Sequence, residues 1–374
     1  MVDALVERRL ADADSAAPDP LSPLLLRGLH VAFLRQVLET TLPSGYAGLD
    51  ASRTWLVYWS LAGLDLIGAL DYDGMIDTRR ACIRFLASCQ SPDGGFGGGP
   101  GQAPHALSTF AALAALTILA RDGGLGVVDT SRLLDFYTRL RVGDGSFRVT
   151  PDGEADTRAV YGVIAGATLA GTAASAETIR RRLWEGSSDF CARAFSHEGG
   201  VGGDPGNEAH GGYTYCALAA TALLRAAGAT ASVSIDAHAA VKWLALRQTR
   251  WGGYAGRANK VVDACYSFWQ AGALVIASDL GGAHAAAALD ADALARYVLR
   301  AAQDPRGGLR DKPGKSADAY HTCYALGGLA LAQHWGGARA ADADRVHATH
   351  ELFNVRPERL QEGRDFWARR AQPP

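Results

Sequence analysis

Three residues in the last third of the chain have the side-chain chemistry of a metal site. Asp263 and Cys265 are separated by one residue, and His321 lies much further along the chain. One oxygen, one sulfur and one nitrogen ligand, with a fourth tetrahedral position left open, is how proteins hold a catalytic zinc ion. The same three residues could instead be a helix-capping Asp, a buried core Cys and a His at a helix start, so their spacing alone does not establish a metal site.

An internal repeat places these residues at equivalent positions. A pair of small residues, Gly-Gly in four copies and Gly-Ser in one, has its second member at positions 95, 146, 200, 253 and 308, a period of 51 to 55 residues. Repeats of this length are helix pairs that bury their apolar faces only against neighbouring repeats. Ten residues after each pair lies a His or an Asp, namely His105, Asp156, His210, Asp263 and Asp318. The loops and helix starts are therefore expected to converge on one end of one domain.

Each repeat is predicted to contain a polar outer helix, a glycine-rich loop and an apolar inner helix. Outer helices are expected at residues 77–88 and 178–193, and inner helices at 107–120 and 213–226. A first helix is expected at 23–41. No segment alternates with period 2 over six residues, so strands are not expected. The predicted fold is all-α, an α/α toroid (an α6-α6 barrel) of concentric inner and outer helices around a central funnel.

Composition is typical of a globular protein and excludes some partners. The chain has 374 residues, of which 48% are hydrophobic and 20% charged, and its net charge is −2, which gives no attraction to nucleic acid. Residues 23–354 are expected to form a single toroid, residues 1–22 a disordered N-terminus and residues 355–374 a charged peripheral tail. The absence of a transmembrane run, a signal peptide and a disulfide framework favours a cytoplasmic location.

A second group of residues has the chemistry of an anion site. His210, Arg257, Lys260 and Tyr266 fall at loop or helix-start positions, where backbone N–H groups also favour anions. A diphosphate is a candidate ligand for them, although a solvated loop rim would have the same composition. No glycine-rich phosphate loop follows a strand, so nucleotide binding is not favoured.

Aromatic residues gather near the starts of the inner helices. Aromatic side chains at helical spacing commonly form a core, but beside a cationic rim they are equally suited to line a tunnel for a long apolar chain. They are Trp55, Tyr58, Trp59, Tyr161, Tyr213, Tyr254, Trp269, Tyr320 and Tyr324.

Long segments of the sequence resemble the β subunits of protein farnesyltransferase, a heterodimeric prenyltransferase that modifies C-terminal CaaX motifs. The resemblance runs from residue 24 to 335 and rests on residues 49–55, 91–102, 208–214, 259–272 and 311–316. It implies transfer of a farnesyl group from farnesyl diphosphate to the cysteine of a CaaX protein. It also implies one zinc ion per chain, assistance by magnesium, and an α subunit as partner.

The resemblance also implies a role for each group of residues. It implies that zinc is held by Asp263, Cys265 and His321, with the substrate thiol as the fourth ligand. It implies that farnesyl diphosphate is bound by His210, Gly211, Gly212, Tyr213, Arg257, Lys260, Tyr266 and Trp269. The peptide is implied to contact Trp59, His105, Glu154, Arg158 and Tyr320. Lipid length is implied to depend on Trp55 and Tyr324, and magnesium to bind at Asp311.

Three other functions share some of these features. The β subunit of geranylgeranyltransferase type I shares the toroid and the zinc, although Trp55, Tyr324 and Asp311 favour the farnesyl enzyme. A class II terpene cyclase would need an Asp-x-Asp-Asp acid, which the sequence lacks. A toroid that only binds a partner would not need three metal ligands together.

The sequence departs from the family pattern at two places. Ala264 stands where the family has Gly between two ligands. Leu107 and Ser108 stand where it has smaller residues or Pro beside the last side chain of the peptide. The ligands themselves are unchanged, so the departures leave open only which terminal residue of the peptide is preferred.

Overall fold

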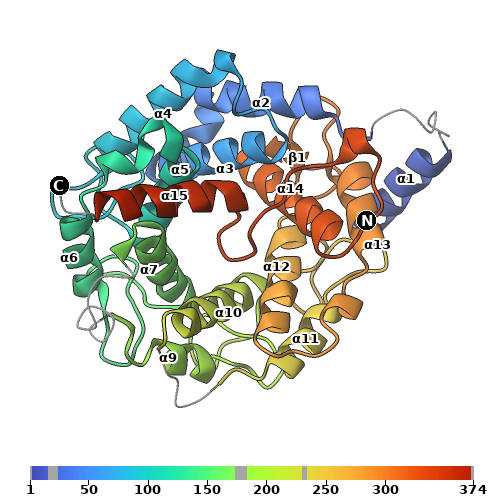
Figure 1. The fold of residues 1–374 in the computed structure, drawn as a ribbon. Coiled ribbons are helices and arrows are strands. Elements are labelled where there is room, and N and C mark those ends of the chain that lie inside the picture. The colour runs from blue at the N-terminus through green and yellow to red at the C-terminus, as the bar shows by residue number, and fades with distance from the viewer. Residues whose placement is uncertain (1, 16–23, 173–182, 230–233, 372–374) are drawn as a thin grey trace.

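Helices in two concentric rings make up most of the protein (Figure 1). The computed structural model describes residues 2–15, 24–172, 183–229 and 234–371. In these residues the inner ring consists of α3 (Arg53–Leu66), α5 (Ala106–Ile118), α7 (Thr157–Leu169), α10 (Gly211–Ala226), α12 (Tyr266–Asp279) and α14 (Ala319–His334). Each inner helix contacts the next and α14 contacts α3, so the ring is closed. The fold is an α/α toroid, as predicted.

The outer ring surrounds the inner one. Its helices in the described ranges are α2 (Arg27–Glu39), α4 (Ile76–Cys89), α6 (Thr130–Leu140), α9 (Ser187–Arg193), α11 (Ala237–Ala245) and α13 (Ala291–Tyr297). Short helical turns connect the two rings at η1 (Ser44–Ser52), η2 (Asp73–Met75), η3 (Ala120–Asp122), η4 (Gly124–Val127), η6 (Ala286–Ala288) and η7 (Val298–Ala302). A further turn, η8 (Asp342–Asp344), lies between α14 and the C-terminal helix. The inner helices are rich in Ala and Leu and buried on nearly all sides, whereas the outer helices bury one face.

The predicted helices largely match the observed ones. The expected inner helices at 107–120 and 213–226 are α5 and α10, and the expected outer helix at 77–88 is α4. The first helix, expected at 23–41, is the shorter α2. Of the outer helix expected at 178–193, residues 187–193 form α9, and part of the remainder lies outside the described residues.

The backbone conformation and close packing at the first glycine of each pair explain why glycine recurs there. Gly94 and Gly252 have φ of 84° and 93°, a conformation that favours glycine. A Cβ atom on Gly94 would lie 1.9 Å from the carbonyl oxygen of Arg132 in α6, and one on Gly252 would lie 2.1 Å from that of Ala293 in α13. Each loop therefore lies against the outer helix of the next repeat, and only glycine permits this approach.

The loops are tied by short antiparallel pairings, including two strands that the sequence did not predict. Strand β1 (Leu309–Arg310) pairs with β2 (Ala317–Asp318), with Leu309 opposite Asp318. Isolated bridges Arg148–Ala155 and Ala255–Val262 occupy the same place in other repeats. These pairings are too short to give a period-2 pattern, because each joins only one or two residues.

A histidine closes the ring between the first and last repeats. His30 in α2 is fully buried, and its Nδ1 atom accepts a hydrogen bond from the Gly308 N–H at 2.9 Å. Its Nε2 atom lies 2.7 Å from Oε1 of Gln303. Because Nδ1 accepts, the neutral ring carries its proton on Nε2 and donates it to Gln303. Both ring nitrogens are thus used, which links α2 to the loop that precedes α14.

The N-terminus differs from the predicted disordered segment. Residues Val2–Ser15 form α1, in which Val6 and Leu10 are buried. This helix contacts η7 beside the fifth repeat, and Glu7 pairs with Arg250 at 2.6 Å. The apolar spacing of Val6 and Leu10, one helical turn apart, explains the docking. Residues 16–23 lie outside the described part of the chain.

The C-terminal segment closes one end of the toroid and is not the peripheral tail that the sequence suggested. Three buried tyrosines of inner helices donate their hydroxyl protons to carbonyl groups of residues 351–354. Tyr215 donates to Glu351 at 2.6 Å, Tyr161 donates to Leu352 at 2.7 Å, and Tyr58 lies 3.0 Å from the Phe353 oxygen. This loop is the floor of the inner ring.

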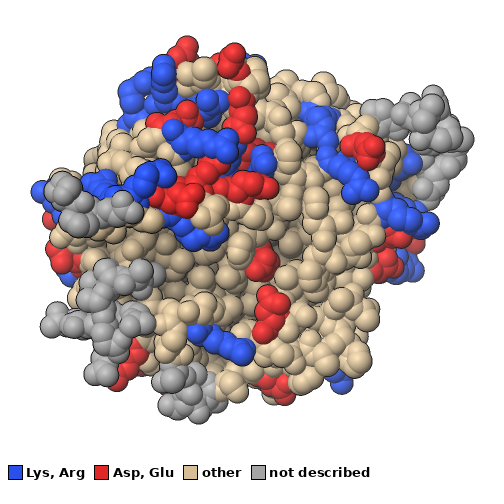
Figure 2. All heavy atoms as spheres, viewed as in Figure 1, with Lys and Arg blue, Asp and Glu red and all other residues tan. Residues whose placement is uncertain are grey.

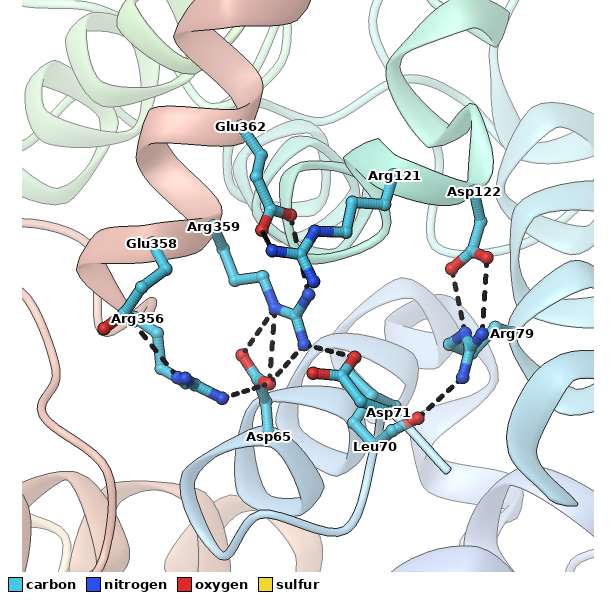
Figure 3. A network of polar contacts seen from close by, with 10 residues as sticks. All are labelled: Asp65, Leu70, Asp71, Arg79, Arg121, Asp122, Arg356, Glu358, Arg359 and Glu362. Atoms are coloured by element: carbon cyan, nitrogen blue, oxygen red, sulfur yellow. Dashed lines mark hydrogen bonds and ion pairs between the residues drawn. The ribbon is translucent and has the colours of Figure 1, made fainter. Parts of the chain in front are cut away.

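Helix α15 (Pro357–Arg370) then crosses the closed end, held by an ion-pair network around the buried Arg359 and Asp65 (Figure 3). The Arg359 guanidinium lies 2.7 Å from Asp65 and 2.6 Å from Asp71. Arg356 also contacts Asp65, at 3.2 Å, and Arg121 contacts Glu362 at 2.6 Å. On this face, acidic and basic side chains lie intermixed over α15 and its neighbours (Figure 2). The charges that suggested a solvated tail are the contacts that dock the helix.

Two further features bear on the sequence predictions. Cys82, Cys89, Cys191 and Cys216 are buried and free, as expected for core residues. Within the described residues, none of the helices has both the length and the apolar character needed to span a membrane.

Candidate functional site

The His or Asp that lies ten residues after each glycine pair stands at the start of an inner helix. His105, Asp156, His210 and Asp318 are the N-cap residues of α5, α7, α10 and α14, and each side chain accepts a backbone N–H of the first turn. Asp263 does the same for the turn before α12, because it accepts the N–H of Cys265 at 2.9 Å. Capping fixes these side chains at one end of the toroid, where the repeats present their polar groups together.

Asp263, Cys265 and His321 meet at this end. One potential ligand atom from each lies within 4.8 Å of those of the other two. His321 Nε2 is 3.2 Å from Asp263 Oδ1, and Cys265 is only 3% exposed. A buried thiol beside a carboxylate and an imidazole is a donor set suited to a tetrahedral metal ion. The structure thus brings together the three residues that the repeat register had predicted.

Asp318 orients His321 and was missed as a site residue. The Asp318 Oδ2 atom lies 2.7 Å from His321 Nδ1, so the opposite nitrogen points toward Asp263. Burial lowers the pKa of His321, but the contacts with Asp263 and Asp318 outweigh it and raise the pKa to about 9. A carboxylate on the far nitrogen of a metal-binding histidine fixes its tautomer. The sequence signal was an Asp three residues before the His at a helix start.

His210 and Tyr266 form the centre of the predicted anion cluster. His210 Nδ1 accepts the N–H of Gly212 at 3.0 Å, and Nε2 lies 3.0 Å from the Tyr266 hydroxyl. Burial and the Arg257 charge lower the pKa of His210 and favour the neutral ring. That ring carries its proton on Nε2 and donates it to the Tyr266 oxygen. The Tyr266 hydroxyl proton is therefore left to donate to a ligand.

Two cations lie at the edge of this cluster, and they differ in whether they form an ion pair. Arg257 pairs with Glu208 at 2.8 Å, and both side chains are partly exposed. Lys260 is exposed, and it makes no ion pair with any described residue. Gly211 is held at the helix start, where its N–H donates to the Gly256 carbonyl at 2.8 Å. The structure brings Arg257 toward His210 and leaves Lys260 on the rim.

A closed circle of eight aromatic rings lines the inside of the toroid. Neighbouring ring centroids are 4.3 to 6.0 Å apart, and every inner helix contributes at least one ring. In order around the circle the residues are Trp55, Trp59, Tyr320, Tyr324, Trp269, Tyr215, Tyr161 and Phe110. Phe110 and Tyr215 are additions to the predicted aromatic set, whereas Tyr254 is fully buried in its repeat loop.

The two residues predicted to set lipid length differ in accessibility. Trp55 is partly exposed and contacts Trp59 and Phe110. Tyr324 is 1% exposed and contacts Trp269, with the two ring centroids 4.3 Å apart. Trp269 donates its indole N–H to the Tyr320 hydroxyl at 3.2 Å. Trp55 thus keeps accessible surface, whereas Tyr324 is covered by its neighbours and contacts Trp269.

The residues expected to bind the peptide lie in two places. Arg158 is held by the cap residue Asp156 at 2.6 Å and lies 3.5 Å from Glu154. The Arg158 guanidinium also lies over the Tyr213 ring, 5.4 Å from its centroid. His105 begins the neighbouring helix, with Nδ1 accepting the Leu107 N–H at 3.1 Å and the Nε2 proton free to donate. Trp59 in α3 contacts Tyr320 in α14, with centroids 5.2 Å apart.

Asp311, the predicted magnesium residue, lies beside the metal ligands. Its carbonyl oxygen accepts the N–H of Ala264 at 2.8 Å, and its side chain contacts the Lys312 ammonium. Ala264 is fully buried, so the extra methyl group at this departure from the family pattern is accommodated in the core.

Comparison with known proteins places the chain in a family. Residues 25–355 match the prenyltransferase alpha-alpha toroid domain. The protein farnesyltransferase subunit beta of Schizosaccharomyces pombe is 38% identical over 80% of this chain and 76% of that protein. The chain belongs to the protein farnesyltransferase subunit beta family. The geranylgeranyl transferase type-1 subunit beta of Arabidopsis thaliana is more distant, at 30% identity over 82% of this chain and 85% of that protein.

A solved structure supports the family's fold for this chain. Candida albicans protein geranylgeranyltransferase-I, complexed with GGPP, aligns with a TM-score of 0.74 over 91% of this chain and 99% of that chain. Its sequence is 21% identical, so the likeness concerns the toroid alone. Family membership agrees with the resemblance found in the repeat loops and with the position of the Asp-Cys-His cluster.

Proposed function

We propose that this chain is the catalytic subunit of a protein farnesyltransferase, which transfers a farnesyl group from farnesyl diphosphate to the cysteine thiol of a CaaX peptide. The observation that carries the proposal is the Asp263–Cys265–His321 cluster, whose ligand atoms lie within 4.8 Å of one another in a member of this family. The cluster lies at the end of the toroid that also holds the cationic residues and the entrance to the aromatic circle.

The donor set fits a zinc ion. It offers one carboxylate, one thiolate and one imidazole, and burial raises the pKa of the Cys265 thiol well above its ordinary value when no metal neutralises it. Bound zinc would supply a Lewis acid that lowers the pKa of a substrate thiol, which is about 8.5 when free. The chain's own part is to hold three ligands, to orient His321 through Asp318, and to exclude water by burial.

The anion cluster is proposed to stabilise the leaving diphosphate. As the bond to the farnesyl carbon breaks, negative charge grows on the diphosphate oxygen. The Tyr266 hydroxyl is free to donate to that oxygen, because His210 already donates to the Tyr266 oxygen. Arg257 would exchange its Glu208 partner for the diphosphate, and Lys260 is available on the rim.

The aromatic circle is proposed to bind the farnesyl chain, and an α subunit is proposed to complete the enzyme. Aromatic faces bury an apolar chain without demanding hydrogen bonds. Two cations, Arg257 and Lys260, together with the neutral His210 ring and one hydroxyl, face a diphosphate of about three charges, so a further cation from a partner would improve charge balance. The assignment of the peptide to His105, Arg158 and Trp59 follows the family resemblance.

Prenyl transfer by the purified chain, with and without a co-expressed α subunit, tests the proposal. The substrates are a CaaX peptide, its Ser-aaX counterpart, and labelled farnesyl or geranylgeranyl diphosphate. We expect a farnesyl thioether on the Cys peptide, none on the Ser peptide, and negligible product without the α subunit. A higher kcat/KM for the geranylgeranyl donor would favour the type I enzyme. Turnover by the chain alone would contradict the need for a partner.

A further inference from the structure

Asp311 and Lys312 form a nearly buried ion pair between the candidate metal site and the anion cluster. The Lys312 ammonium contacts Asp311 Oδ1, and the Lys312 and Asp311 side chains are 10% and 20% exposed. The Asp311 carbonyl accepts the Ala264 N–H at 2.8 Å, so the pair adjoins the segment that carries Asp263 and Cys265. In the described part of the chain, Lys312 has no second ion-pair partner.

The Asp311 carboxylate is compensated in charge but not fully bonded. Its Oδ1 atom is buried and makes no hydrogen bond of acceptable geometry, although the ammonium is in contact. The charge of the Asp263 carboxylate also acts on Asp311, so negative charges gather in a partly desolvated place. A buried carboxylate needs a cation close by. In the absence of a bound metal, Lys312 is that cation.

A lysine is suited to this task because its charge can move. The ammonium group is a compact charge on a flexible stem of four carbons, with three donors that rotate freely. A hard divalent cation prefers carboxylate and diphosphate oxygens as ligands. Such a cation cannot share Asp311 Oδ1 with the ammonium, because the two positive charges would then be in contact.

We propose that Lys312 is an internal counter-ion that competes with a divalent cation for the Asp311 carboxylate. In the metal-free protein the ammonium compensates Asp311. A divalent cation that arrives with a diphosphate takes the carboxylate and turns the ammonium away, toward the diphosphate oxygens. The inference rests on the proposed function, because a diphosphate is the ligand that would bring the cation. Its consequence is that Lys312 weakens divalent-cation binding.

The test measures Mn²⁺ affinity by electron paramagnetic resonance of the free ion, so it needs no turnover. The sample is the full chain with its α subunit, loaded with zinc so that Mn²⁺ does not enter the Asp263 cluster, with and without inorganic diphosphate. The variants are Lys312→Gln and Lys312→Met, which remove the charge, and Lys312→Arg, which keeps it. Lys315→Gln is the matched control, because Lys315 is exposed in the same loop. Asp311→Asn removes the ligand.

We expect Lys312→Gln and Lys312→Met to bind Mn²⁺ at least fivefold more tightly than the unmodified protein. Lys312→Arg and Lys315→Gln should bind as the unmodified protein does, and Asp311→Asn should lose the site. Unchanged or weaker Mn²⁺ binding in a neutral variant with an unchanged melting temperature would overturn the inference. Because two neutral variants are measured, the test can still be made if one of them does not fold. Lack of prenyl transfer would contradict the proposed function instead, and would leave the Mn²⁺ comparison without diphosphate intact.

Discussion

The Nδ1 atom of His321 lies 2.7 Å from the Oδ2 atom of Asp318, three residues earlier at the start of α14. The same aspartate caps the helix, because its other oxygen accepts the His321 N–H at 2.8 Å. One side chain therefore fixes both the helix start and the orientation of the imidazole. This pairing makes Asp318 a positioning residue for the candidate metal site.

Replacing Asp318 by Asn should weaken metal binding without removing a ligand. Asparagine can still cap the helix, but it removes the charge that holds the His321 ring and makes its other nitrogen a better ligand. The expected loss is about 10- to 100-fold in zinc affinity, measured by competition with a chelating dye. Asp156→Asn, at the equivalent cap of α7, is the matched control and should keep its zinc. Equal zinc affinity in Asp318→Asn would show that the carboxylate does not position His321.

Trp55→Thr should shift the lipid preference toward a longer chain. Trp55 is a partly exposed member of the aromatic circle on α3, so its removal opens space inside the toroid. An overfilled site rejects additional methylene groups, and the enlarged one should accept the twenty-carbon donor. The ratio of kcat/KM for geranylgeranyl over farnesyl diphosphate should rise at least about tenfold, or about 1.4 kcal/mol. Trp251→Thr, in a repeat loop, should leave the ratio unchanged. The same ratio in both variants would count against Trp55.

Much of the site was predictable because the repeat made it periodic. The fixed offset from each glycine pair put Asp263, Cys265 and His321 into adjacent repeats, and adjacency in the ring brought them together. The role of Asp318 was not predictable in the same way, because a capping Asp occurs in other repeats with no histidine beside it. In the sequence, only the histidine three residues later separates Asp318 from Asp156, and only the structure shows that the carboxylate and the imidazole meet.

The ends of the chain were predicted poorly for a physical reason. Helix α15 has a strongly polar sequence, and local composition cannot show that Arg359 is 3% exposed and bonded to Asp65, nearly three hundred residues away in sequence. The interior floor at residues 351–354 is likewise held by tyrosine hydroxyl groups that bond to backbone carbonyls, which leave no side-chain pattern.

Arg359→Met should destabilise the toroid by about 3–5 kcal/mol, the cost of leaving a buried charge without its partner. Asp65 is 2% exposed and would keep only Arg356, at 3.2 Å. The control is Arg339→Met, whose pair with Asp292 lies at the surface and should contribute little to the free energy of unfolding. Urea unfolding of both variants, followed by circular dichroism, gives the comparison. An equal decrease in the free energy of unfolding in the two variants would mean that the ion-pair network at the closed end does not hold α15.

Acid should weaken the closure of the ring through His30. Burial lowers the pKa of His30 below its ordinary value of about 6.5. The folded protein then takes up this proton less readily than the unfolded chain, so the contribution of neutral His30 is present above about pH 6.5 and is lost as the pH falls. A second ring proton would also face the Gly308 N–H that now donates to Nδ1.

The decrease in melting temperature between pH 7.5 and pH 5.5 should therefore be smaller in His30→Gln than in the unmodified protein. Melting temperatures at the two pH values give the comparison. Other histidines titrate in both proteins, so their effects cancel in the difference. An identical pH dependence of both proteins would exclude His30 as a contributor.

Zinc content and farnesyl transfer, measured together on the chain with its α subunit, test the central claim most directly. The protein is assayed as purified, after chelation, and after zinc is restored, alongside Cys265→Ala. The account predicts one zinc per chain, loss of transfer to the CaaX peptide on chelation, and recovery with one equivalent of zinc. It predicts neither zinc nor transfer in Cys265→Ala, with helical content unchanged. Full transfer by metal-free protein, or full zinc occupancy in Cys265→Ala, would contradict it.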